Sequence, residues 1–542
     1  MVSGRHKKRL EELLENEQEI VLEKMELLYR WNSTFTITQL PNEILLLIFI
    51  CFSEGLVWSD DERENLPRSQ LAKTGWMELM LVCRRWRDVA LVTPLLWRTM
   101  NVGTTTDWFK LALTRSSLAS IEVSFTSHDV SEEQVFLLKP HLHRLRRICF
   151  PLAPISAHIF STMEDNTSYP ALEAMEIYKT GIHLQVSGDL RITTKHFPHL
   201  QVLSLTRAVM PEDISVYARL RKLRLWDCPC RFSLNTFVQL LASSPNLESL
   251  ELDEILGQLD DDDHGDRTSG QPAHLLPSLR SLRLDHHCLL HSARFLSRIL
   301  LPPTASLSIR TLGDIEQGYT LRSFLPSNPR DLLPGLASVT RATLFITGGE
   351  MSLHGWTAQK RVVLQASIHP LDDEDGWEAP LSEGLDDLLK ILCPASLTHL
   401  TINGKSVVAD PAEWATLFSS LPTLAWLQIG ADDNAFVGLL MASRRRKRST
   451  DEPIACSRLR RLAVKGDWFI YHNLDIFCDT LVECLQYRAR RGSRLRVLQA
   501  QLIYHESVEW ENAEAEALFR RQHLPRLQRL VAEVRWVVGP RS

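Results

Sequence analysis

The chain lacks most of the features that point to an enzyme or a secreted protein. Its 10 cysteines and 23 glycines are scattered over 542 residues. There is no Gly-rich phosphate-binding motif, no Gly-x-Ser-x-Gly motif and no His-Glu-x-x-His zinc motif. Cysteines this sparse do not form a disulfide framework. We therefore expect a reducing compartment, no cofactor, no metal ion and no catalytic activity.

A strong net charge and a long apolar run are also missing. The formal net charge is −5, too small to attract nucleic acid or an anionic membrane in bulk. The longest apolar run, Ile44 to Phe52, is shorter than the roughly 20 residues that span a bilayer. The residues from Arg5 to Lys24 are charged, unlike a secretory signal. We expect a soluble intracellular protein, cytoplasmic or nuclear or both, without membrane contact.

Apolar residues recur at helical spacing among Glu and Lys between residues 7 and 31. This pattern predicts an amphipathic helix, and we assign residues 1–34 to it. We expect the helix to pack back on the segment that follows. A coiled-coil seam stays open as an alternative, although it requires three or more sustained heptads.

Two apolar helical segments come next. Pro41 suits the first position of a helix, and Glu43 in the first turn complements the helix dipole. The residues after Glu43 are nearly all apolar, and their stripe is wide enough to contact both its own domain and a partner. The stripe consists of Ile44, Leu45, Ile48 and Phe49. In the second segment, Leu79, Val82, Trp86 and Val89 share one face.

These two segments resemble the halves of the F-box, a short helical module. The family begins with Leu-Pro-x-Glu-Ile/Leu-Leu-x-x-Ile-Phe and ends with Val-Cys-Arg-x-Trp-Arg-x-x-Ala. The first half matches at Leu40, Pro41, Glu43, Ile44, Leu45, Ile48 and Phe49. The second half matches at Val82, Cys83, Arg84, Trp86, Arg87 and Ala90. The continuation from Ala90 to Trp97 looks like the fungal form of the family, and the linker from Cys51 to Gly75 is longer than usual.

A short pattern repeats through residues 106–542: a leucine, then apolar residues three and five positions later. The last two alternate as a strand requires, with both side chains turned inward. A proline often stands two residues before the leucine, where it ends a helix and starts a turn. Clear copies begin at Leu118, Leu145, Leu172, Leu200, Leu220, Leu247, Leu279, Leu397, Leu424 and Leu459, with weak copies at Leu495 and Leu527.

The pattern resembles irregular leucine-rich repeats, each a strand followed by a helix. The expected fold class is therefore α/β: an N-terminal helical F-box module over residues 35–105, then a leucine-rich-repeat-like solenoid over residues 106–542. The acidic stretch from Gln258 to Pro272 and the basic run from Ser443 to Ser449 interrupt it as loops. Residues 345–395 are less regular, and added strands or an insertion are both open there.

Two further residue groups suggest ligands. Cys228 and Cys230 with His286, His287 and Cys288 are zinc-ligand types. However, one repeat lies between the two groups, which separates their strand ends by about 10 Å, too far for one ion. The basic run Arg444 to Arg448 is a solvated loop, a nuclear import signal or a nucleic-acid contact. Nucleic acid is least favoured, because no aromatic residues interleave with these charges.

The F-box resemblance implies recruitment of a target protein. F-box proteins bind the Skp adaptor of a Skp–cullin–F-box ubiquitin ligase, and their repeats hold the target. A scaffold outside any ligase and a nucleic-acid-binding repeat protein are the alternatives. The implied adaptor-binding residues are Leu40, Pro41, Ile44, Leu45, Ile48, Phe49, Val82, Cys83 and Trp86. The target-binding residues, which flank the inward pairs of neighbouring strands, are predicted to be Arg224, Trp226, Glu251, Asp253, Arg283 and Asp285.

Overall fold

The computed structural model separates into two compact units, Met1–Val216 and Tyr217–Ser542. It describes residues 19–28, 30–31, 34, 40–55, 74–103, 106–125, 131–151, 169–178, 192–230, 232–259, 273–286, 289–313, 320–347, 349–370, 381–392, 396–404, 409–430, 433–445, 454–467, 474–503, 516–517 and 519–539. The domain boundary predicted after residue 105 lies inside the first unit, because the F-box segment supplies a strand to the sheet of that unit.

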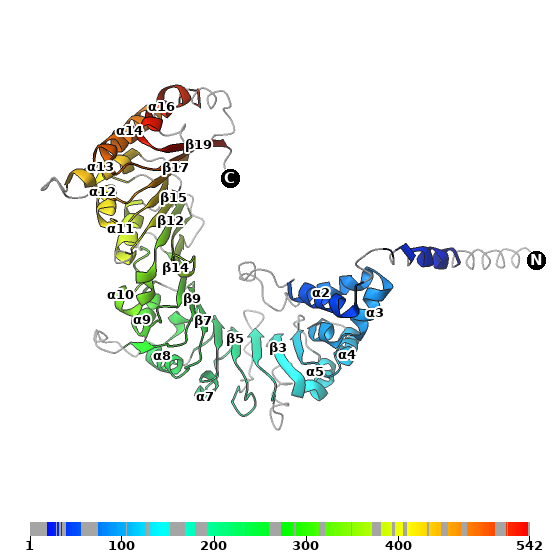
Figure 1. Cartoon of the computed structure of the whole chain (residues 1–542). Helices are drawn as coiled ribbons and strands as arrows, with labels where there is room; N and C mark the ends of the chain where they lie inside the picture. The colour runs from blue at the N-terminus through cyan, green and yellow to red at the C-terminus, as the bar shows by residue number, and fades with distance from the viewer. Residues whose placement is uncertain are drawn as a thin grey trace, which may run out of the picture. The chain divides into compact units, whose positions relative to one another are not determined.

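The first unit begins with helices. Residues 19–28 are helical, as predicted, but their apolar side chains are exposed, so the expected packing on the F-box segment is not seen. The helices that follow are α2 (Asn42–Gly55), η3 (Thr74–Leu81), α3 (Arg84–Val92) and η4 (Pro94–Trp97). Figure 1 shows α2 beside α3. The linker between them falls largely outside the described residues.

A parallel sheet completes the first unit. Its strands are β1 (Thr99–Val102), β2 (Ile121–Phe125), β3 (Leu145–Pro151), β4 (Ala174–Tyr178) and β5 (Val202–Thr206). They pair in chain order, and all pairs are parallel. The intervening helices are α4 (Thr106–Arg115), α5 (Glu132–Leu138) and η5 (Lys139–Arg144). Ser131 and Gln134 form a reciprocal capping box that starts α5. The short helix α7 (Ile214–Tyr217) spans the boundary of the units.

The second unit has a larger, mostly parallel sheet. Its order is β6-β7-β9-β11-β14-β13-β12-β15-β16-β17-β18-β19. The strands are β6 (Lys222–Trp226), β7 (Ser249–Asp253), β9 (Ser281–Asp285), β11 (Ser306–Gly313), β12 (Arg341–Thr347), β13 (Glu350–Trp356), β14 (Val362–Pro370), β15 (His399–Gly404), β16 (Trp426–Gly430), β17 (Arg461–Asp467), β18 (Val497–Ile503) and β19 (Glu533–Gly539). A separate pair joins β8 (His274–Leu275) to β10 (Ile299–Leu300).

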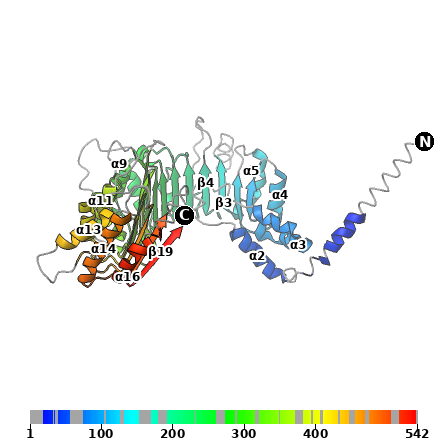
Figure 2. The ribbon, with the colours of Figure 1, turned by 90° about the horizontal axis from the view of Figure 1, so that it is seen from above.

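Helices cover one face of this second sheet, and its other face is open (Figures 1 and 2). The helices are α8 (Leu234–Ala242), η6 (Leu256–Gln258), α9 (Leu289–Ser297), α10 (Pro329–Leu332), η9 (Pro334–Ser338), α11 (Leu381–Leu392), α12 (Pro411–Ser420), α13 (Asp433–Arg445), α14 (Leu474–Arg490), the π-helical turn η10 (Phe519–His523) and α16 (Leu524–Leu530). Strand side chains alternate between buried, towards the helices, and partly exposed, towards the open face.

The inward residues of the predicted pattern form ladders across the strands. Leu223 pairs with Leu250, Leu250 with Leu282, and Leu282 with Leu307 of β11. All four are buried. The stacking of identical positions on successive strands therefore builds the apolar layer between sheet and helices, as the alternation predicts.

The turn before each strand explains the prolines. The N–H of Leu247 donates to the Ser244 carbonyl at 3.2 Å, and the N–H of Leu279 donates to the Leu276 carbonyl at 3.2 Å. Pro245 and Pro277 thus occupy the second position of four-residue turns, where the fixed φ of proline is suited.

The ends of four strands carry a feature that the sequence does not reveal. The residue after the strand has positive φ in four successive strands: Arg207 at 55°, Asp227 at 47°, Glu254 at 51° and His286 at 53°. None is a glycine, so each bend costs energy that the surrounding sheet must offset. The N–H of Asp227 donates to the Asp253 carbonyl at 2.9 Å, which extends the ladder past the bend.

The irregular region beginning at residue 345 contains added strands. β13 is antiparallel to both β12 and β14 and lies between them, whereas β11 pairs with β14 and β12 with β15 in parallel. The weak copy at Leu527 needs correction, because Leu527 and Leu530 lie in α16 and the strand follows at β19. In the described residues, no helix is long and apolar enough to cross a membrane.

Candidate functional site

Helices α2 and α3 pack through an aromatic contact. Leu45 and Phe49 of α2 are fully buried, and Trp86 of α3 is almost so. The ring centroids of Phe49 and Trp86 are 5.1 Å apart at a tilted angle, a favourable aromatic geometry. Burial of these side chains holds α2 and α3 together.

An arginine fixes the start of α2. The guanidinium of Arg85 donates to Asn42 Oδ1 at 2.9 Å and also to the Leu40 carbonyl. The N–H groups of Ile44 and Leu45 donate to the Pro41 carbonyl, each at 3.1 Å, so the first helical turn begins at the proline. Arg85 therefore ties the second half-motif to the beginning of the first.

Three tryptophans pack together where the helical segment meets the first strand. Trp97 Nε1 donates to the Ala90 carbonyl at 2.9 Å. The Trp97 ring lies 5.0 Å from Trp76 and 5.2 Å from Trp108 of α4, centroid to centroid. Trp97 is buried, and β1 begins two residues later. The helical module and the first strand thus share one core.

The remaining apolar residues of α2 face outward. Ile44 is 43% exposed, Leu47 57%, and Ile48 and Phe52 37% each. Their spacing of three and four residues puts them on one side of the helix, which we call the α2 stripe. Leu81 and Val82, just before α3, are also exposed, at 78% and 51%. Exposed apolar side chains gathered in this way mark an interaction surface.

The predicted adaptor-binding residues divide into three groups. Pro41, Ile44, Ile48 and Val82 are exposed, and Leu40 and Cys83 are half-buried. By contrast, Leu45, Phe49 and Trp86 lie in the interior. The sequence pattern placed all apolar positions of α2 in one stripe, but a helix that packs on α3 must turn one side inward.

The exposed apolar residues that the prediction missed include Leu47, Phe52 and Leu81. Leu47 and Phe52 could have been found, because they continue the three- and four-residue spacing from Ile44 and Ile48. Leu81 carried no such signal. It is the last residue of η3, three positions before the start of α3.

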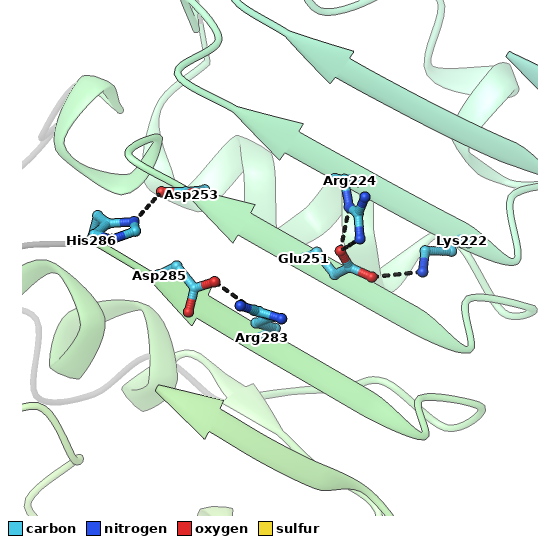
Figure 3. Close-up of polar contacts among 7 residues, drawn as sticks. All are labelled: Lys222, Arg224, Glu251, Asp253, Arg283, Asp285 and His286. Atoms are coloured by element: carbon cyan, nitrogen blue, oxygen red, sulfur yellow. Dashed lines mark hydrogen bonds and ion pairs between the residues drawn. The ribbon is translucent and has the colours of Figure 1, made fainter. Parts of the chain in front are cut away.

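The charged residues of the predicted target-binding set lie together on β6, β7 and β9 (Figure 3). Arg224 pairs with Glu251 across the strands, and Glu251 with Arg283. In the next register row, Trp226 pairs with Asp253, and Asp253 with Asp285. We call this set, with Lys222 and His286, the charged cluster. The side-by-side arrangement agrees with the strand pattern in the sequence.

Glu251 is the centre of the cluster. It forms ion pairs with Arg224 and with Lys222, whose Nζ is 2.6 Å from Glu251 Oε1. Burial raises the pKa of the Glu251 carboxyl, but the positive charges of Arg224 and Lys222 outweigh this and hold the pKa below its ordinary value. The carboxylate is therefore charged at neutral pH and bound on both sides.

The other acidic residues are also paired. Arg283 forms an ion pair with Asp285, and His286 Nδ1 lies 3.0 Å from Asp253 Oδ1. Burial raises the pKa of Asp253 to about 6, against the opposing effect of His286. The cluster therefore contains as many cations as carboxylates: Lys222, Arg224 and Arg283 against Glu251, Asp253 and Asp285. Trp226, at 44% exposed, is the apolar member at its edge.

Of the candidate metal ligands, the structure describes only Cys228, Cys230 and His286. The thiol of Cys228 is buried and donates to the Trp226 carbonyl at 3.4 Å. His287 and Cys288 lie outside the described residues. Within the described ranges, no group of three or more His, Cys, Asp or Glu residues could hold a metal ion.

The basic run lies mostly outside the described residues, which include only Arg444 and Arg445 of it. Arg444 lies in the last turn of α13 and forms an ion pair with Glu483 of α14, at 3.0 Å.

Comparison with known families matches residues 37–102 to the F-box-like family model. A search of curated proteins finds no match to the chain. The matched segment contains α2, η3, α3, η4 and β1, and ends where the first strand ends. The family match and the packing of α2 on α3 identify residues 37–102 as an F-box-like domain, which supports the assignment of this chain as an F-box protein.

Proposed function

We propose that this protein recruits a target protein to a Skp–cullin–F-box ubiquitin ligase. F-box domains generally bind Skp-type adaptors, and the observation that carries the proposal is the α2 stripe within the segment that matches the family. In this proposal the chain performs no chemistry itself. It acts in the cytoplasm, the nucleus or both. It raises the local concentration of the target near the transferring enzyme.

The adaptor contact consists of Ile44, Leu47, Ile48 and Phe52 with Leu81 and Val82. Burial of each apolar side chain contributes about 1.5–3 kcal/mol before the costs of ordering. Several such side chains together are enough for a specific complex. Leu45, Phe49 and Trp86 support this surface from beneath by holding α2 on α3.

We further propose that the strand-and-helix region of each unit is a leucine-rich-repeat-like array with the target on its open face. The leucine ladders, the repeated turns with proline and the positive-φ residue after β5, β6, β7 and β9 support this interpretation. The charged cluster with Trp226 is one candidate contact on that face, since aromatic and arginine residues are enriched in binding hot spots.

The test changes the stripe without touching the core. The Ile44→Asp, Ile48→Asp double variant should lose capture of a purified Skp-type adaptor, because two charges would replace buried apolar contacts. The matched control is Leu118→Asp with Phe136→Asp, two apolar residues of the first unit that are 90% and 75% exposed. The control should bind the adaptor as the unchanged protein does. Undiminished capture by the stripe variant would refute the assignment.

Copurification separates the alternatives. A complex that contains both adaptor and cullin indicates a ligase, whereas adaptor alone indicates a scaffold outside the ligase. A nucleic-acid-binding protein would instead retain RNA or DNA with an affinity that falls steeply as salt rises.

A further inference from the structure

A row of aromatic and basic side chains crosses the open face of the second unit, away from the charged cluster. Its members are Trp356 of β13, Arg341 of β12, His399 of β15, Trp426 of β16 and Arg461 of β17, which we call the aromatic–basic row. Strand pairing sets them side by side: Trp356 with Arg341, Arg341 with His399, His399 with Trp426, and Trp426 with Arg461.

The row is accessible. Arg461 is exposed, and the other four members are partly exposed. The rings of His399 and Trp426 are 5.9 Å apart, centroid to centroid, and those of His354 and Trp356 are 5.8 Å apart. Each indole therefore has a neighbouring ring that holds it in place while part of its surface remains in water.

The two arginines of the row differ from those of the charged cluster. Within the described residues, the side chains of Arg341 and Arg461 form no ion pair and no hydrogen bond. The nearest acidic residue in the same register row, Glu533, is two strands from Arg461 and bonds Arg535, with its Oε1 2.6 Å from Arg535 Nε. The charged cluster is internally neutralised, whereas in the row Arg341 and Arg461 form no ion pair among the described residues, although the charge of Arg461 helps to lower the pKa of Glu533 from two strands away.

The pKa of His399 is sensitive to the positive charges of the row. Burial lowers the pKa of its imidazole, and the positive charges of Arg341 and Arg461 lower it further. His399 is therefore neutral at physiological pH and leaves the arginines as the charges of the row. An anionic group placed here would be attracted by both.

The strand spacing sets the length of the ligand. Arg341 and Arg461 are separated by three strand steps of about 4.8 Å each, which is roughly 14 Å. An extended peptide advances about 3.3 Å per residue, so roughly four residues cover this distance. Trp426 lies between the two arginines, at the step next to Arg461.

We propose that the aromatic–basic row binds an acidic segment of a partner protein in extended conformation. Two carboxylates about four residues apart contact Arg341 and Arg461, and an apolar side chain between them packs on Trp426. The inference rests on the proposed function and deepens it. It assigns the target contact to the aromatic–basic row rather than to the charged cluster, and it names an acidic segment as the target class. A carboxylate-rich ligand fits better than nucleic acid, since two cations are too few to follow a phosphate backbone.

The test uses the full-length protein and a fluorescein-labelled peptide with two aspartates four positions apart and a phenylalanine between them. Fluorescence anisotropy should detect binding that weakens with added salt. The same peptide with asparagines, and one with the aspartates adjacent, should each bind at least tenfold more weakly. Equal binding of all three peptides, or tighter binding of a single-stranded RNA of similar length, would overturn the proposal.

Variants locate the contact. Arg341→Glu with Arg461→Glu, and separately Trp426→Ala, should each weaken peptide binding at least tenfold. The matched control is Arg330→Glu with Arg490→Glu, which makes the same charge change at exposed positions of α10 and α14. Unchanged binding by the row variants, or equal loss in the control, would contradict the proposal.

Adaptor capture distinguishes a failure here from a failure of the proposed function. The row variants should retain the adaptor, whereas the α2 stripe variant should retain the peptide. If the peptide fails to bind while the adaptor is captured, only the inference about the row is lost.

Discussion

Arg224 and Trp226 lie two residues apart on β6. Only Arg224 takes part in an ion pair that stabilises the fold. The sequence predicts that both contact a target. The structure gives Arg224 a second role, because its guanidinium neutralises the partly buried carboxylate of Glu251. A binding test with Arg224 is therefore confounded by stability.

We expect Arg224→Ala to lower the melting temperature, while Trp226→Ala leaves it nearly unchanged. Loss of one partner leaves Glu251 with Lys222 alone, at a cost of about 1–2 kcal/mol. Thermal unfolding of both variants and of Glu251→Gln completes the measurement. In the Glu251→Gln background, Arg224→Ala should cost less, since no carboxylate remains to be neutralised. An equal cost in both backgrounds would show that the ion pair is not the cause.

At the scale of the element, α12 and α13 pack closely because of one glycine. A Cβ on Gly438 would meet the Pro411 carbonyl oxygen at 2.8 Å and the side chain of Trp414. These are backbone and rigid ring-bearing groups at the start of α12, and they cannot move aside. Gly384 of α11 differs, because its Cβ would meet the flexible ends of Ile346 and Leu344, at 2.9 and 3.2 Å.

We expect Gly438→Ala to destabilise the second unit and Gly384→Ala to change its stability little. Alanine gains about 1 kcal/mol in a helix interior, but overpacking costs about 1–3 kcal/mol where nothing can yield. Thermal unfolding of the two variants, monitored by circular dichroism, measures the difference. If Gly438→Ala melts at or above the temperature of the unchanged protein, the helices have room that the structure does not show.

Strands β1 and β12 have the same spacing of buried apolar residues without the leading leucine. Trp97, Met100 and Val102 occupy the three positions for β1, and Val339, Ala342 and Leu344 occupy them for β12. All six are buried. A search for leucine overlooks them, because burial in the ladder selects apolar shape rather than one residue type.

At the scale of the whole molecule, the described cysteines are all free thiols, in both units. Cys149, Cys478 and Cys484 are buried, and burial raises the pKa of each to about 12. Cys51 is exposed on α2, four residues after Leu47 and thus beside the α2 stripe. Packing rather than covalent cross-links therefore holds these parts of the chain.

We expect brief alkylation with iodoacetamide near pH 8 to modify Cys51 and spare Cys149, Cys478 and Cys484, since thiolate is the reactive form. Mass spectrometry of the digested protein measures the labelling, and unfolding in guanidinium should make all of them react. Adding the Skp-type adaptor should protect Cys51. Labelling of the buried thiols in the folded protein would contradict the packing described here.

The sequence by itself determined the two F-box half-motifs, the inward pairs of most strands and the turns that precede them. These depend on local chemistry: helical or strand periodicity, and the fixed φ of proline. The family match over residues 37–102 agrees with the first of these. Most of the strand positions could therefore be predicted from neighbouring residues alone.

Only the tertiary structure decided which apolar side chains of α2 turn inward, because Phe49 is buried by Trp86 from a segment about 37 positions away (86 − 49). It also decided that the charged cluster is neutralised internally while Arg341 and Arg461 lack ion pairs within the described residues. Both outcomes depend on which strands and helices become neighbours. Pairing across strands far apart in sequence, such as β11 with β14 and β12 with β15, leaves no local signal that periodicity can detect.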